Sequence, residues 1–184
     1  LNKLYKFTQL QSSFSVNSIA LVKGRPKLLN LKELISNFVE HRHDVVVRRS
    51  KYELKKAEER AHILKGLIVA SDNIDRVIEL IRSSENTESA KKSLQDQFEL
   101  TEIQAKAIVE MRLRQLTGLE QEKLRDEFEE LNKTIERLKN ILSNKDLRMD
   151  IIKDELTVVK DKYGDERRSI IDYTGGNFSV EDMI

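Results

Sequence analysis

The sequence contains no cysteine and no tryptophan, and it holds few helix-breaking or aromatic residues. Its 184 residues include six glycines, one proline and 5% aromatic residues. The absence of cysteine excludes disulfides, thiolate nucleophiles and cysteine metal sites, and it is compatible with a reducing cytoplasm. The scarcity of glycine and proline predicts that helix dominates. The scarcity of aromatic residues, with 35% charged residues, argues against one large compact core.

Long hydrophobic runs are also missing. No uninterrupted apolar stretch approaches the roughly 18 residues that a membrane helix needs. The opening Leu1-Asn2-Lys3 has neither an initiator methionine nor the layout of a signal peptide. We therefore expect a soluble, cytoplasmic internal fragment of a longer protein, with no membrane partner.

Two apolar stripes at helical spacing predict a long antiparallel coiled-coil arm. The later stripe alternates steps of four and three, which is typical of a coiled-coil seam. At about 1.5 Å per residue, Leu119–Tyr163 could extend roughly 65 Å and the earlier helix, 31–65, roughly 50 Å. The later stripe comprises Leu124, Phe128, Leu131, Ile135, Leu138, Leu142, Met149, Ile152, Leu156, Val159 and Tyr163. The earlier stripe comprises Leu31, Leu34, Ile35, Phe38, Val45, Tyr52, Ala57, Ala61, Leu64 and Ile68.

Capping and turn signals divide the rest of the chain. A short helix is expected at Asn2–Thr8, and a strand or hairpin at Phe14–Val22 before the turn signal Lys23–Pro26. Capping boxes, in which a side-chain oxygen accepts otherwise unsatisfied backbone N–H groups, are predicted at Asn30/Glu33, Thr101/Gln104 and Thr117/Glu120. Short helices are expected at Asp72–Arg82, Thr87–Phe98 and Thr101–Gln115, with glycines 66, 118 and 164 at element ends. A fourth capping pair, Ser143/Asp146, predicts a helix break or kink, although the unbroken phase of the stripe favours collinear helices.

The predicted fold is therefore mainly α, with a small helical lobe at the tip of the arm and a short β segment near the N-terminus. Five regions follow: 1–30 with the short helix and the β segment, 31–65 as the first arm helix, 66–118 as the lobe, 119–163 as the returning helices, and 164–184 as a tail. In the last helix of the lobe, Ile103, Ala107 and Met111 face one side and Ala105, Val109 and Leu113 the other. One side suits the lobe core. The other is covered either by the returning arm helix or by a second copy of the chain.

No catalytic or metal-binding pattern is present. His41 and His43 are two residues apart, so a helix directs them about 200° apart and they cannot converge on one metal. Acidic pairs such as Glu58-Glu59 fit a solvated helix face. No phosphate-binding glycine loop or nucleophile elbow occurs. We therefore expect no catalytic, cofactor or metal site within this sequence.

Positive charge is concentrated at the N-terminal end. The first 30 residues hold five of the 33 basic residues and no acidic one, which leaves 28 basic against 32 acidic residues for the remainder. Such a bias can place a segment near a polyanion, although a solvated face is the simpler interpretation. The basic residues that could lie near such a polyanion are Lys3, Lys6, Arg42, Arg48 and Arg49.

Five segments resemble the family of DNA gyrase A subunits. Residues 104–120 read QAKAIVEMRLRQLTGLE, which closely resembles that family's Q-A-x-A-I-L-x-M-R-L-x-x-L-T-G-L-E segment. The resemblance covers essentially the whole chain in family order. The further matching segments are Asn2–Gln11 (end of the tower region), Val39–His43 with Arg48-Arg49, Arg60–Leu64 (first coiled-coil helix) and Tyr163–Arg168 (Y-G-D-E-R-R exit).

The resemblance implies the coiled-coil arm and exit gate of a type IIA topoisomerase that introduces negative supercoils into double-stranded DNA by ATP-dependent strand passage. It implies a homodimer through the lobe and an A2B2 assembly with the gyrase B subunit, which would supply the Mg²⁺ and ATP sites. The implied dimer-interface residues are Gln104, Ala105, Ile108, Val109, Arg112, Leu116 and Thr117.

The family's nucleophilic tyrosine lies upstream of residue 1, and the tyrosines at 5, 52, 163 and 173 stand in other contexts. The fragment alone is therefore expected to be inactive. The topoisomerase IV A subunit remains an alternative, with Leu116–Glu120 favouring gyrase. Periodicity alone would also fit a coiled-coil adaptor or a synthetase arm.

Overall fold

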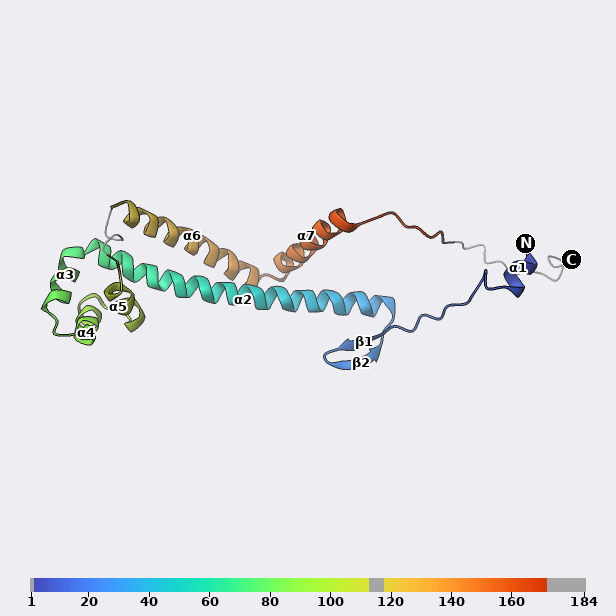
Figure 1. Ribbon diagram of the computed structural model, residues 1–184, viewed down its shortest axis with the longest axis horizontal. Helices are drawn as coiled ribbons and strands as arrows, with labels where there is room; N and C mark the ends of the chain where they lie inside the picture. Colours follow the sequence, from blue (N-terminus) through green and yellow to red (C-terminus); the bar gives the residue numbers. More distant parts are fainter. Residues whose placement is uncertain (1, 113–117, 172–184) are drawn as a thin grey trace. The chain divides into compact units, whose positions relative to one another are not determined.

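The computed structural model describes residues 2–112 and 118–171. The chain forms two compact units: the described parts of Leu1–His41 and Lys153–Ile184 make unit 1, and Arg42–Ile152 makes unit 2. Nearly all regular structure is helical (Figure 1). The predicted mainly α fold with one short β segment is confirmed.

Unit 1 begins with helix α1 (Asn2–Phe7), at the predicted position. A two-stranded antiparallel hairpin follows, with β1 (Ile19–Val22) paired to β2 (Arg25–Leu28). The connection is only the two residues Lys23 and Gly24, both at positive φ, of 52° and 79°. Positive φ at both central residues is typical of the tight hairpin turn that matches strand twist. The predicted turn was therefore too long, since Arg25 and Pro26 already belong to β2.

Helix α2 (Leu31–Asp72) starts at the predicted capping box. The Asn30 side-chain oxygen accepts from the Glu33 N–H at 2.9 Å, and the Glu33 carboxylate accepts from the Asn30 N–H at 3.0 Å. The predicted end at Gly66 is wrong. The helix continues for six more residues, and Gly66 is buried inside it.

The lobe of unit 2 consists of α3 (Ile74–Ser83), α4 (Thr87–Phe98) and α5 (Glu102–Val109). The bounds of α4 agree with the prediction, but α5 ends six residues before the predicted Gln115. Glu110 is its C-cap, and Met111 leaves the helix to pack against the core. The core draws on four helices: Leu64, Leu67 and Ala70 of α2, Val77 of α3, Leu94 of α4, and Ala105 and Ile108 of α5.

Helix α6 (Gly118–Ser143) lies beside α2 in unit 2, in antiparallel orientation. Three ion pairs join the two helices. The residue that contributes from α6 moves from 139 to 125 as the residue from α2 moves from 58 to 72, as expected for helices that run in opposite directions. The pairs are Glu58–Lys139, Arg60–Glu127 and Asp72–Arg125. Leu124, Phe128 and Leu131 of α6 pack against the lobe core. The predicted antiparallel packing is thus confirmed here, and α6 covers part of the lobe within the chain.

Helix α7 (Lys145–Tyr163) follows a break at Asn144, which confirms the predicted interruption. The cap is Asn144 and not Ser143, because the Asn144 side-chain oxygen accepts from the Asp146 N–H at 2.9 Å. The Thr117/Glu120 capping box involves Thr117, which lies outside the described residues. The predicted end of α7 before Gly164 is confirmed.

The seam is shallow along most of α6, and its α2 side departs from the predicted stripe at two positions. Leu138 and Ile152 are buried, but the other described seam residues up to Met149 are half-buried. In α2 the predicted residues Ala57, Ala61 and Leu64 are buried, but Val46 and Ser50 are buried where Val45 and Tyr52 were predicted; Tyr52 is 64% exposed. In unit 1 the two stripes do not bury each other. The exposed side chains there are Leu31, Ile35 and Phe38 of α2 and Leu156, Val159 and Tyr163 of α7.

Candidate functional site

Gln104 joins helix α5 to helix α2 through hydrogen bonds of its buried side chain. Its side chain is 5% exposed, and its Nε2 donates to the His62 carbonyl at 2.7 Å. Its Oε1 accepts from the Thr101 N–H at 3.0 Å, which completes the predicted capping box. The Thr101 hydroxyl in turn lies 2.7 Å from His62 Nε2. Buried amide groups need such partners, so Gln104 fixes both the start of α5 and its position on α2.

Gly66 makes this close approach possible. A Cβ placed on Gly66 would lie 2.7 Å from the Gln104 Cβ and 2.8 Å from its Cγ. Contacts below 3.0 Å are not tolerated by real side chains, so glycine is required here by packing and not by helix termination. A glycine inside an otherwise apolar helical stretch was the only sequence signal for this contact.

The predicted interface residues of the lobe fall into three groups. Gln104, Ala105 and Ile108 are at most 5% exposed within the chain, packed between α5 and the lobe core. Val109 is half-buried and Arg112 is exposed. Leu116 and Thr117 lie outside the described residues. Ile103, which was predicted to lie on one apolar face of this helix but was not among the interface residues, is 61% exposed in the first turn of α5.

The candidate DNA-proximal residues lie in both units. Lys3 and Lys6 are exposed on α1 in unit 1, and the Lys6 ammonium stands 6.0 Å from the centre of the Phe7 ring. Arg48 and Arg49 are exposed on α2 in unit 2, and Arg42 is half-buried. The five residues are therefore divided between the two units.

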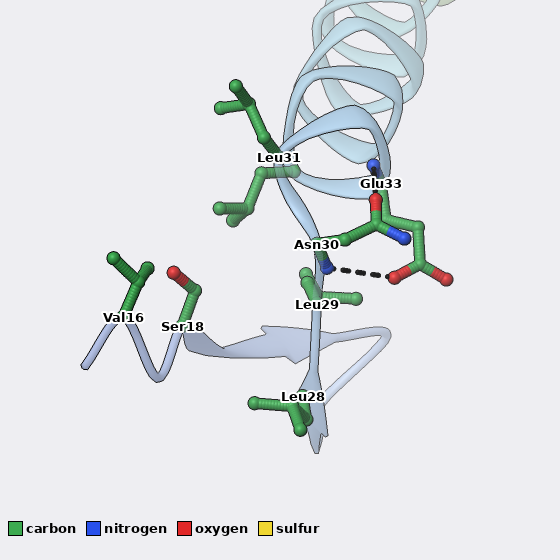
Figure 2. A pocket seen from close by; sticks show the side chains of 8 residues that line it. Val16, Ser18, Leu28, Leu29, Asn30, Leu31 and Glu33 are labelled. Carbon is green, nitrogen blue, oxygen red and sulfur yellow. Dashed lines mark hydrogen bonds between the residues drawn. The ribbon is translucent and has the colours of Figure 1, made fainter. Parts of the chain in front are cut away.

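A groove of about 680 Å³ lies where the hairpin meets the start of α2 (Figure 2). Val16, Leu28, Leu29 and Leu31 give it mostly apolar walls. Its one carboxylate, Glu33, is already committed to the capping box. The Asn30 N–H, and secondly the Lys27 ammonium, hold the pKa of that carboxyl below its usual value. Because Glu33 is the single titratable side chain that lines it, the groove offers no acid–base pair.

The described part of the chain offers neither a metal site nor a membrane span. Among residues 2–112 and 118–171, no group of three histidine or acidic side chains could hold a metal ion. His43 instead accepts a hydrogen bond from Arg148. Within the same ranges, no helix is long and apolar enough to cross a membrane.

Comparison with known proteins gives consistent matches. A family model for the A subunit of DNA gyrase/topoisomerase IV matches residues 1–157. The chain is 52% identical over 182 residues to the DNA gyrase A subunit of Staphylococcus epidermidis and 48% identical over 184 residues to that of Clostridium acetobutylicum. These alignments cover 99% and 100% of this chain but 20% and 22% of the relatives. The chain thus spans about a fifth of the length of the curated relatives it matches.

Proposed function

The chain belongs to the family of DNA gyrase/topoisomerase IV A subunits, and on that premise we propose that it forms the coiled-coil arm and the exit-gate lobe of a gyrase A subunit. The observation that carries the proposal is the antiparallel pairing of α2 with α6 beside a compact lobe of short helices. Long paired helices resist bending, and a small lobe that they carry can meet a second copy. Both properties suit a gate that must hold and release.

In the complete enzyme the chain has a mechanical role. The enzyme is an ATP-dependent type IIA topoisomerase that introduces negative supercoils into double-stranded DNA, in an A2B2 assembly in the bacterial cytoplasm. The nucleophilic tyrosine belongs to another part of the A subunit, and the Mg²⁺ and ATP sites belong to the B subunit. By itself, this chain neither cleaves nor relaxes DNA. The basic residues Lys3, Lys6, Arg42, Arg48 and Arg49 lie on the DNA side.

The gate surface is a symmetric contact between two copies of the lobe. A two-fold contact is the commonest solution for homodimers. Val109, Arg112, Leu116 and Thr117 supply contacts from the end of α5 and the segment after it. Gln104, Ala105 and Ile108 contribute indirectly, by fixing the position of α5. Their side chains are already buried by contacts within the chain. We therefore propose that four of the seven implied interface residues make the contact and that the other three support it.

Gyrase is preferred to topoisomerase IV as the parent enzyme. The family model spans both enzymes, but the relatives from S. epidermidis and C. acetobutylicum are both gyrase A subunits. Family membership leaves the coiled-coil adaptor and the synthetase arm without support.

Light scattering tests the proposed dimer. The expected mass is twice the chain mass of 21.4 kDa at tens of micromolar. A variant with Arg112→Glu should shift the equilibrium toward monomer, because a carboxylate cannot make the hydrogen bonds and ion pairs that the guanidinium makes in the proposed contact. The matched control is Arg76→Glu on α3. A monomeric mass from a chain whose circular dichroism shows the full helical content would contradict the proposal.

A further inference from the structure

Arg148 ties three helices together at the break between α6 and α7. Its Nη1 donates to the carbonyls of Ile141 at 2.8 Å and Leu142 at 2.6 Å, both in the last turn of α6. Its Nε donates to Nε2 of His43 on α2 at 2.9 Å. All of these groups belong to unit 2, and the Arg148 side chain is half-buried.

The guanidinium satisfies groups that the break would otherwise leave open. The last carbonyls of a helix have no partner within the helix. In α6 the Asn140 carbonyl accepts from the Asn144 N–H at 3.0 Å and from the Ser143 hydroxyl at 2.9 Å. Arg148 satisfies the next two carbonyls, and a cation is also favoured at this negative end of the helix dipole.

His43 takes part as an acceptor. Because Nε2 accepts the Arg148 N–H, that nitrogen carries no hydrogen in this arrangement, and the ring hydrogen lies on Nδ1. The Asp44 carboxylate is 4.0 Å from Nδ1, too far for a hydrogen bond but on the side that favours this tautomer. A side chain at position 43 must therefore present an acceptor, and a purely apolar or cationic group cannot replace it.

We propose that Arg148 is a positioning residue that sets the direction in which α7 leaves α6 and fastens this joint to α2. The inference rests on the proposed arm function, because a joint of fixed geometry lets movement at one end of an arm reach the other. A guanidinium suits the task, since its rigid fork reaches two carbonyls and a ring nitrogen at once. A lysine ammonium is a single point donor on a flexible stem.

The joint can be measured in the assembled enzyme with spin labels at Asn132→Cys on α6 and Asp150→Cys on α7, both exposed positions. We expect one narrow distance distribution in the parent protein. Arg148→Gln and Arg148→Lys should both broaden the distance distribution. The ratio of molecules that keep the parental angle between α6 and α7 to those that lose it should fall about tenfold. His43→Leu should broaden it as well, whereas His43→Gln should keep it narrow because its side-chain oxygen can still accept.

Arg125→Gln is the matched control, because Arg125 links α6 to Asp72 of α2 without touching the joint. It should leave the distribution narrow. If Arg148→Gln fails to fold, Arg148→Lys and His43→Leu carry the test, with circular dichroism as the check on helix content. An unchanged distribution in folded Arg148 variants overturns the proposal, as does equal broadening by His43→Gln and His43→Leu.

Supercoiling assays separate this inference from the proposed gate. A broadened joint with slower strand passage and unchanged DNA cleavage supports the positioning role. A broadened joint with parental strand passage overturns that role and leaves the gate intact. A lobe that does not dimerise removes the gate, but the distance between α6 and α7 still decides whether Arg148 sets the joint.

Discussion

The Cα of Gly66 faces the side chain of Gln104 so closely that an added Cβ would lie 2.7 Å from the Gln104 Cβ. Gly66→Ala should therefore destabilise unit 2. The gain in helix propensity is at most about 1 kcal/mol, whereas overpacking of a rigid contact costs about 1–3 kcal/mol. Urea unfolding followed by circular dichroism measures the difference. Gly118→Ala is the control, because nothing lies within 4 Å of a Cβ added at Gly118. The free energy of unfolding of this variant should equal that of the parent protein or exceed it.

Gln104→Ala should cost about 1–3 kcal/mol in the free energy of unfolding, because the His62 carbonyl loses one of its donors and the Thr101 N–H loses its capping acceptor. The same substitution at Gln97, exposed on α4, should be close to neutral. Equal effects at the two positions would show that the buried network contributes nothing specific.

Leu138→Ala should destabilise the arm more than Leu131→Ala. Leu138 is 2% exposed whereas Leu131 is half-buried. A fully buried leucine typically costs about 2–5 kcal/mol when truncated, and a shallow one costs less. Denaturant unfolding of the two variants gives the order directly. If truncating Leu131 costs as much or more, the assignment of the deep seam position is wrong.

Much of the local structure could be predicted from sequence, because it depends on neighbours along the chain. The capping boxes at Asn30/Glu33 and Thr101/Gln104 and the bounds of α4 are of this kind. The break near Asn144 was also predicted, although Ser143 was taken for its cap. Such features need only a polar side chain at a fixed spacing.

The predictions were wrong where the structure of a residue depends on a contact with a residue distant in the sequence. Gly66 reads as a helix end until Gln104 is seen to occupy the space of its missing side chain. Val46 and Ser50, rather than Val45 and Tyr52, face inward because packing selects the buried face. The role of Arg148 depends on carbonyls of another helix and on a histidine 105 residues away, and no periodicity encodes that contact. The burial of Gln104 and Ala105 within the chain was not predicted for the same reason, because it depends on their packing against distant residues.

The pKa of Glu33 should lie below its usual value of about 4.3. The Asn30 N–H is the larger cause and the Lys27 ammonium the second, so Lys27→Met should raise the pKa only part of the way back. Because the folded-state pKa is lowered, the contribution to stability is present above the unfolded-state pKa and is lost as the pH falls through the folded-state value. Carbon-13 NMR titration of the carboxyl group checks both statements. A complete return in Lys27→Met would show that the capping hydrogen bond has no influence.

The exit-gate assignment is tested most directly by locking the lobe in the assembled enzyme. A cysteine at Ala105 would be buried within one chain, so Arg112→Cys, at an exposed position, is the better choice. Oxidation should join two copies, as a denaturing gel would show, and reduction of the same preparation provides the control. With crosslinking complete, we expect DNA cleavage to persist while supercoiling over many turnovers stops, because the transported duplex cannot leave. Supercoiling by the crosslinked enzyme at the rate of the reduced enzyme would contradict it.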